Sequence, residues 1–172
     1  MAVTIITSTM LSVTACSQSP TPDATSTAAT ANSLDATDSL TSAIQGIDAA
    51  IYGYGIVGAH LTGSEQKKVV RAMAALTRQR LAFMLAVGSQ VNASAVAYEL
   101  PFAVTDQVSA KKLGAQLEVR LIPLFNAVIA DTTGPVNIAA RLAKTKATAR
   151  AAFWAGTSNN PAPNASTSGV TP

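Results

Sequence analysis

The chain holds one histidine, His60, and one cysteine, Cys16, so few catalytic arrangements can be assembled from its side chains. A helix turns by about 100° per residue, and this count places His60 opposite the apolar stripe of its own segment, where it faces water. A histidine there cannot serve as the base of a serine or cysteine triad. The glycine spacing of GYGIVG, residues 53–58, matches neither a Walker motif nor a dinucleotide-binding turn. We therefore predict that the protein is not an enzyme.

A di-iron or di-manganese centre with oxidase or ferroxidase activity is the other chemistry that a helical chain commonly supports. Such a centre needs a Glu from each of two helices and a Glu-x-x-His from each of the other two, all directed inward. The fourth helix that we predict, residues 136–155, contains no Asp, Glu or His and can supply no ligand. We expect no metal and no other cofactor, and the di-metal oxidase is the least favoured of our interpretations.

Cys16 ends a short apolar segment and has the surroundings of a lipidated cysteine. Val13 stands three positions before it and Ala15 directly before it, as bacterial lipoprotein signals require for acylation of the thiol with fatty acids such as palmitate. The basic residues that usually begin a secretory signal are absent. We predict that residues 1–16 are a lipoprotein signal peptide and that Cys16 anchors the chain to the outer face of the plasma membrane, in the bacterial cell envelope. The alternative is a free thiol, because a single cysteine forms no intramolecular disulfide.

The rest of the 172 residues divides into one apolar domain between two polar segments. Residues are 48% hydrophobic but only 5% aromatic, a balance that favours helices packed through small side chains over a β-sandwich. Residues 17–34 and 157–172 are small, polar or Pro and show no apolar periodicity, so we predict a disordered tether and a disordered tail. The folded domain is predicted to span residues 35–156.

Four stretches of this domain carry apolar residues three and four positions apart, which predicts four helices. The first stripe comprises Leu40, Ile44, Ile47, Ile51, Tyr54, Gly58 and Leu61. After a cap at Ser64, the second comprises Val69, Val70, Met73, Thr77, Arg80, Leu81, Met84 and Val87. The third helix opens at Thr105 or Asp106, carries Leu113, Leu117, Leu121, Leu124, Phe125 and Val128, and contains Pro123, which should kink it. The fourth stripe comprises Ile138, Leu142, Ala149 and Phe153.

Helices of this length with mostly short connections predict an all-α fold, an antiparallel four-helix bundle. Gly55 and Gly58 lie on or beside the buried stripe of the first helix, where a missing side chain lets a neighbouring helix approach closely. The basic outer faces of the helices carry Lys67, Lys68, Arg71, Arg78, Lys111, Lys112, Arg141, Lys144, Lys146 and Arg150.

Arg80 is a charged residue on an apolar stripe, that of the second helix. A guanidinium keeps its proton when it is buried, so Arg80 needs a carboxylate nearby unless it reaches solvent at a bundle end. The candidates are Asp48 and Glu118, at the edges of the first and third stripes. We expect a buried polar cluster that comprises Asp48, Arg80, Glu118, Glu99 and Tyr52, with Arg80 paired to Asp48 or to Glu118. Such a cluster fixes the register of the helices or, alternatively, lines a polar ligand pocket.

The stretches GYGIVGAHL (53–61), AYELP (97–101), LEVR (117–120), AARLA (139–143) and FWAG (153–156) together resemble an uncharacterised ferritin-like family of secreted proteins and lipoproteins of actinobacteria. The resemblance covers about residues 34–161 and implies a ferritin-like four-helix bundle with no defined activity. Where that family has a Glu-His pair in the first helix, this chain has Ile47 and Asp48, and Thr77 stands where a His usually precedes two arginines. Both departures remove candidate metal ligands.

Two classes of function remain open. The first is a non-catalytic envelope lipoprotein whose bundle binds a protein partner or a small ligand. The second is a membrane-surface module that binds lipids through the basic helix faces. An exported protein with few aromatic residues is not expected to bind nucleic acid. The oligomeric state stays open.

Overall fold

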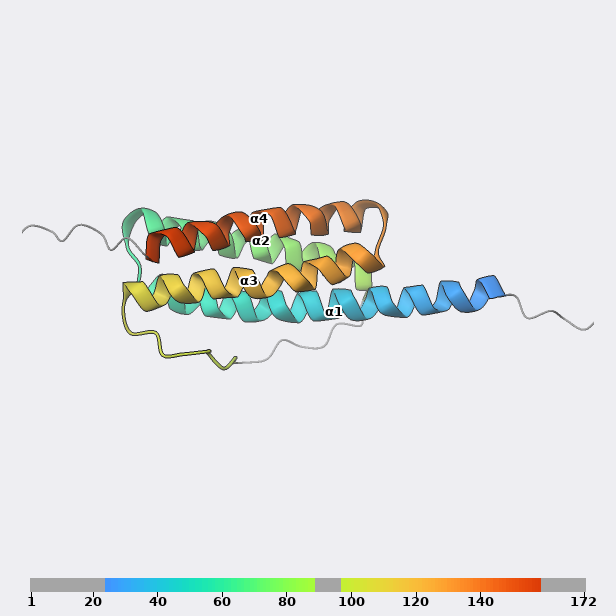
Figure 1. Ribbon diagram of the computed structural model, residues 1–172, viewed down its shortest axis with the longest axis horizontal. Helices are drawn as coiled ribbons and strands as arrows, with labels where there is room; N and C mark the ends of the chain where they lie inside the picture. Colours follow the sequence, from blue (N-terminus) through green and yellow to red (C-terminus); the bar gives the residue numbers. More distant parts are fainter. Residues whose placement is uncertain (1–23, 89–96, 159–172) are drawn as a thin grey trace, which may run out of the picture.

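The computed structural model describes the backbone of residues 24–88 and 97–158. This part of the chain contains four helices, α1 (Ala24–Ala59), α2 (Gly63–Val87), α3 (Gln107–Asp131) and α4 (Gly134–Ser158), and no strand. The helices pack side by side as a four-helix bundle (Figure 1), so the predicted fold class is confirmed. The predicted signal peptide, with Cys16, lies outside the described residues.

Each helix runs antiparallel to the helices it packs against (Figure 1). α1 packs against α2 and α3, α3 packs against α4, and the contact between α2 and α4 is the sparsest of the four. Short turns join α1 to α2 and α3 to α4. In contrast, α2 ends at one end of the bundle and α3 begins at the other, so one long connection joins opposite ends (Figure 1).

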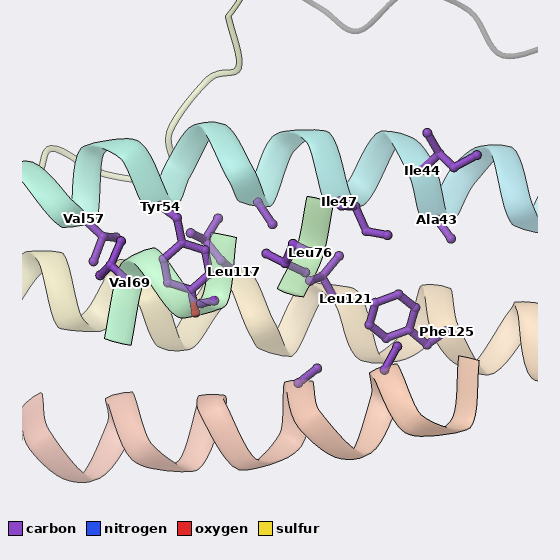
Figure 2. Packing of buried hydrophobic residues seen from close by; sticks show 14 of the residues in the cluster. Ala43, Ile44, Ile47, Tyr54, Val57, Val69, Leu76, Leu117, Leu121 and Phe125 are labelled. Carbon is purple, nitrogen blue, oxygen red and sulfur yellow. The ribbon is translucent and has the colours of Figure 1, made fainter. Parts of the chain in front are cut away.

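The core lies between the helices, and two of the predicted stripes form most of it. Leu113, Leu117, Leu121, Phe125 and Val128 of α3 are all buried, as predicted. They meet the α1 residues Leu40, Ile44, Ile47, Tyr54 and Leu61, which are buried too, and Figure 2 shows part of this interface. Of the described helices, α3 alone has the length and hydropathy to cross a membrane, and core helices of bundles commonly meet that criterion.

The buried face of α4 differs from the predicted one. Ile138 and Leu142 are 68% and 53% exposed, and the stripe that faces the core consists of Ala140, Ala143, Ala147, Ala151 and Trp154. On α2, Val70 and Leu81 are likewise exposed, while Ala72, Leu76 and Phe83 are buried beside Val69. Alanines let the helices approach closely, while Ile138 and Leu142 project outward and Trp154 is the one large apolar side chain of this buried stripe.

The predicted start is confirmed for α3 but is wrong for α1 and α2. Asp106 caps α3, because its carboxylate accepts a 2.7 Å hydrogen bond from the Ser109 amide while the Ser109 hydroxyl accepts one from the Asp106 amide. The predicted cap at Ser64 is wrong, since α2 begins at Gly63 with Thr62 in the capping position. α1 begins at Ala24, so residues 24–34, predicted as part of a disordered tether, are helical.

Glycines set the distance between α1 and its neighbours. A Cβ atom at Gly58 would lie 3.2 Å from Val69, which agrees with the predicted close approach. The prediction for Gly55 is wrong, because nothing lies within 4 Å of a Cβ placed there. Gly53 has that function instead, since its Cβ would lie 2.8 Å from both terminal carbons of Leu117.

Candidate functional site

Glu118 is the centre of a buried polar network that joins three helices. Its carboxylate, fully buried on α3, accepts hydrogen bonds from Arg150 of α4 through Nε (2.5 Å) and Nη2 (2.9 Å). It also accepts one from the Tyr54 hydroxyl of α1 at 2.6 Å, and that hydroxyl accepts one from Trp154 Nε1 at 2.9 Å. We call Tyr54, Glu118, Arg150 and Trp154 the central cluster.

The protonation states of the central cluster follow from its burial and its charges. Burial raises the pKa of Tyr54 far above its ordinary value, and the negative charge and hydrogen bond of Glu118 raise it further. Burial alone would lower the pKa of Arg150, but the hydrogen bonds and charge of Glu118 outweigh it and the net shift is upward. The tyrosine is therefore neutral, and the arginine is a cation whose charge balances the carboxylate.

A second ion pair joins α1 to α2. Arg80 Nε donates to Asp48 Oδ1, and Arg80 Nη1 lies 2.8 Å from the sulfur of Met84. Of the two predicted partners of Arg80 the structure selects Asp48, because Glu118 is held by Arg150. The two carboxylates thus belong to separate networks rather than to one cluster.

Tyr52 and Glu99 do not join the buried polar residues, so this part of the predicted cluster is wrong. Two residues along a helix correspond to a rotation of about 200°, and the burial of Tyr54 therefore turns Tyr52 outward. Tyr52 is 36% exposed and packs against Tyr98, with 5.8 Å between ring centroids. Glu99 is exposed, in the segment that precedes α3.

Two basic residues predicted on outer faces are instead paired with buried or partly buried carboxylates. Lys111 is buried, and its ammonium lies 2.8 Å from Glu65 of α2. Arg150 turns inward to Glu118. The spacing of Ala143, Ala147, Arg150 and Trp154, four, three and four positions apart, was the signal that could have placed Arg150 on the core side.

A groove lies between α2 and α4, and we call it the α2/α4 groove. It contains two pockets that share Arg150, an inner pocket of about 130 Å³ and an aromatic pocket of about 310 Å³. The inner pocket is lined by Arg78, Gln79, Phe125, Leu142, Lys146 and Arg150, among others. The aromatic pocket is lined by Lys68, Arg71, Ala72, Ala149, Arg150, Phe153 and Trp154.

The positive charges of the bundle are concentrated on α2 and α4, the two helices that form this groove. α2 and α4 together carry nine of the twelve Lys and Arg residues of the chain but one acidic residue, Glu65, which is paired with Lys111 of α3. α1 carries no Lys or Arg. Among the described residues, no carboxylate forms an ion pair with Arg71, Arg78 or Lys146. The groove is therefore a cationic surface that can hold an anion.

The carboxylates of the bundle are scattered rather than gathered. Within residues 24–88 and 97–158, no three Asp, Glu, His or Cys side chains lie close enough together to hold a metal ion. The guanidinium of Arg150 also occupies the space beside Glu118 that a metal cation would need, and its charge would repel one.

Comparison with known proteins places this architecture in a group without an assigned activity. A solved structure, that of a conserved hypothetical protein, rv2844, from Mycobacterium tuberculosis, is similar with a TM-score of 0.67 and 25% sequence identity. The similarity covers 71% of this chain and 96% of that chain. No curated protein matches the sequence. Residues 39–167, which include the central cluster and the α2/α4 groove, match a family by sequence, and the chain therefore belongs to the family described as Domain of unknown function (DUF4439).

Proposed function

We propose that the protein is a non-catalytic lipoprotein of the bacterial cell envelope whose bundle binds a small anionic ligand in the α2/α4 groove. The observation that carries this proposal is the set of cations Arg71, Arg78 and Lys146, which line one groove without a carboxylate partner among the described residues. Uncompensated cations in a concave site attract anions and favour their binding.

The aromatic pocket supports a ligand that has an apolar part as well as a negative charge. Phe153 and Trp154 pack edge to face with 4.9 Å between ring centroids, and the Lys68 ammonium lies 4.3 Å from the centre of the Phe153 ring. Arg71 lines the same pocket. Aromatic rings beside cations suit an organic anion better than an inorganic ion.

The central cluster supports a binding function over a catalytic one. Its carboxylate is already bound by three donor atoms, and its charges are balanced, so no group in it is free to accept or donate a proton at neutral pH. We infer that the cluster is structural and that it occupies the position in which a ferritin-like bundle would hold metal ligands. The single long connection between α2 and α3 supports a ferritin-like topology.

Cys16 supplies the membrane anchor in this proposal. Labelled fatty acid should enter the wild-type protein in its native host and should not enter the Cys16→Ser variant, which we expect in the soluble fraction. If the variant stayed in the membrane fraction as the wild type does, the lipoprotein part of the proposal would be wrong.

The groove is tested with 1-anilinonaphthalene-8-sulfonate, an aromatic sulfonate, and the full chain carrying Cys16→Ser. Trp154 is the only tryptophan, and it lines the aromatic pocket, so its fluorescence should be quenched as the probe binds. Arg71→Glu should weaken binding by about tenfold or more, since it reverses a charge in the pocket. Lys112→Glu, the same change at an exposed site on α3, is the matched control and should leave binding unchanged. Equal weakening in both variants would show that net charge, rather than the groove, attracts the probe.

The second candidate function is contact with an anionic membrane surface. It is favoured by cations of α2 and α4 that lie outside both pockets, such as the exposed Lys67 and Arg141. The unacylated chain should then bind phosphatidylglycerol vesicles at low salt, and Lys67→Glu combined with Arg141→Glu should abolish that binding while probe binding in the groove persists. Undetectable binding at low salt would exclude this function.

A further inference from the structure

We propose that the inner pocket of the α2/α4 groove is a site for a phosphate monoester group, free or as the headgroup of a lipid. The inference deepens the proposed function and rests on it, because it names the charged part of the ligand. Two observations carry it. Within residues 24–88 and 97–158, two cations of this pocket have no carboxylate partner, and one buried donor has no acceptor.

That donor is the side-chain amide nitrogen of Gln79. It is buried, and it has no hydrogen-bond partner among the described residues. A buried N–H group without an acceptor is costly and uncommon in folded proteins. Because Gln79 lines the inner pocket, an oxygen atom of a bound anion in that pocket would supply the acceptor.

The charge of the pocket selects a dianion. Glu118 neutralises Arg150, whereas Arg78 of α2 and Lys146 of α4 have no carboxylate partner among the described residues. Two uncompensated positive charges match the charge of a phosphate monoester, about −1.5 to −2 at neutral pH. A carboxylate or a phosphodiester carries a single negative charge and would leave one cation unbalanced.

The size and the donors of the pocket also fit this group. Its volume of about 130 Å³ far exceeds the roughly 10–15 Å³ that one water molecule needs on the same measure. A guanidinium fork, an ammonium and an amide approach from two helices, which suits a tetrahedral group with several acceptor oxygens. The neighbouring aromatic pocket, which shares Arg150, would hold the organic part of the ester.

The first arm of the test uses inorganic phosphate and the full chain with Cys16→Ser, with chloride at equal ionic strength as the reference. Phosphate should raise the midpoint of thermal unfolding, because a ligand that binds only the folded state stabilises it. Lys146→Gln should weaken phosphate binding by at least about tenfold. The matched control is Lys144→Gln, which removes the same charge two residues away on α4, outside both pockets, and should leave binding unchanged.

Gln79→Leu separates a binding role from a structural one. Removing the unpaired amide should leave the ligand-free protein as stable as the parent chain or more stable, while phosphate binding weakens. If the variant bound phosphate as the parent does, the amide would not contact the anion and the inference would fail.

The second arm distinguishes the source of the phosphate. Vesicles that contain phosphatidic acid, a lipid monoester, are compared with phosphatidylcholine vesicles. The site is supported, and its ligand is a lipid headgroup, if the protein binds phosphatidic acid vesicles but not phosphatidylcholine vesicles. This binding should be lost in Lys146→Gln and kept in Lys144→Gln. Binding of inorganic phosphate with the same dependence supports a soluble ester. Absence of both, or equal loss in the two lysine variants, overturns the inference, and the proposed function survives if the aromatic sulfonate still binds in an Arg71-dependent way.

Discussion

Glu118 and Asp48 are each paired with an arginine of a neighbouring helix, but they differ in burial. The Glu118 side chain is 0% exposed, while the side chains of Asp48 and Arg80 are 10% and 27% exposed. A carboxylate that loses its partner in the interior keeps a charge that water cannot reach. The two ion pairs therefore make different contributions to stability.

We predict that Arg150→Met lowers the free energy of unfolding by about 3–5 kcal/mol, since it leaves Glu118 without its cation. Arg80→Met should cost less, because water reaches Asp48. Chemical denaturation of the two variants measures the difference.

The control for this prediction is the double variant Arg150→Met with Glu118→Leu. It removes both charges and should cost less than the sum of the two single changes, as a double-mutant cycle would report. Additive losses would show that the two side chains do not interact.

Because of Tyr54, we predict that the bundle loses stability at alkaline pH. Its pKa is raised in the folded state, so the contribution is fully present below about pH 10, the ordinary value of a tyrosine, and is lost as the pH rises further. Above that pH the unfolded chain releases a proton that the folded chain retains. The free energy of unfolding should therefore fall by up to about 1.4 kcal/mol per pH unit. Denaturation curves at pH 9 and pH 11 measure this slope, which should be shallower in Tyr54→Phe and unchanged in Tyr52→Phe.

Among the elements, α1 offers a matched pair of glycines. Gly55→Ala adds a methyl group in open space and should raise the free energy of unfolding by up to about 1 kcal/mol through helix propensity. Gly53→Ala gains the same propensity but pushes against Leu117, and overpacking of a core costs roughly 1–3 kcal/mol. Gly53→Ala should thus be the less stable variant in denaturation, and equal stabilities would mean that α1 and α3 are not in close contact there.

The helices α1 and α3 were predictable from the sequence because their stripes consist of large aliphatic residues. Leu113, Leu121 and Phe125 leave one choice of buried face. The polar start of α3 was equally readable, since Asp106 lies just before the helical pattern.

The face of α4 was not predictable in the same way. Ile138 and Leu142 suggested that their side of the helix is buried. The side that faces the core instead consists mostly of alanines, whose small surface gives a weak periodic signal. That error in phase also placed Arg150 in solvent, although it lies on the same stripe as Ala147 and Trp154. The pairing of Glu118 with Arg150 and the α2/α4 groove depend on this face, so neither was predicted, although Glu118 was expected in a buried polar cluster.

In the whole molecule, some pairs of helices are joined by buried polar contacts and close packing, whereas α2 and α4 are not. The central cluster connects α1, α3 and α4, and the ion pair of Asp48 and Arg80 connects α2 to α1. Between α2 and α4 the packing is sparse, and the positive charge is concentrated there. A bound anion would offset the mutual repulsion of these cations and link the two helices, so the groove is the part of the bundle that gains most from a ligand.

The central claim, that this groove is where the protein binds its ligand, is tested most directly by backbone amide NMR. The ¹⁵N-labelled full chain with Cys16→Ser is titrated with 1-anilinonaphthalene-8-sulfonate, and the residues whose signals shift are mapped. We predict that the largest shifts occur in α2 and α4 between residues 68 and 79 and between residues 142 and 154, including the indole N–H of Trp154. Shifts confined to the pocket beside Tyr52 and Tyr98, between α1 and α3, or spread evenly over the bundle, would contradict the account.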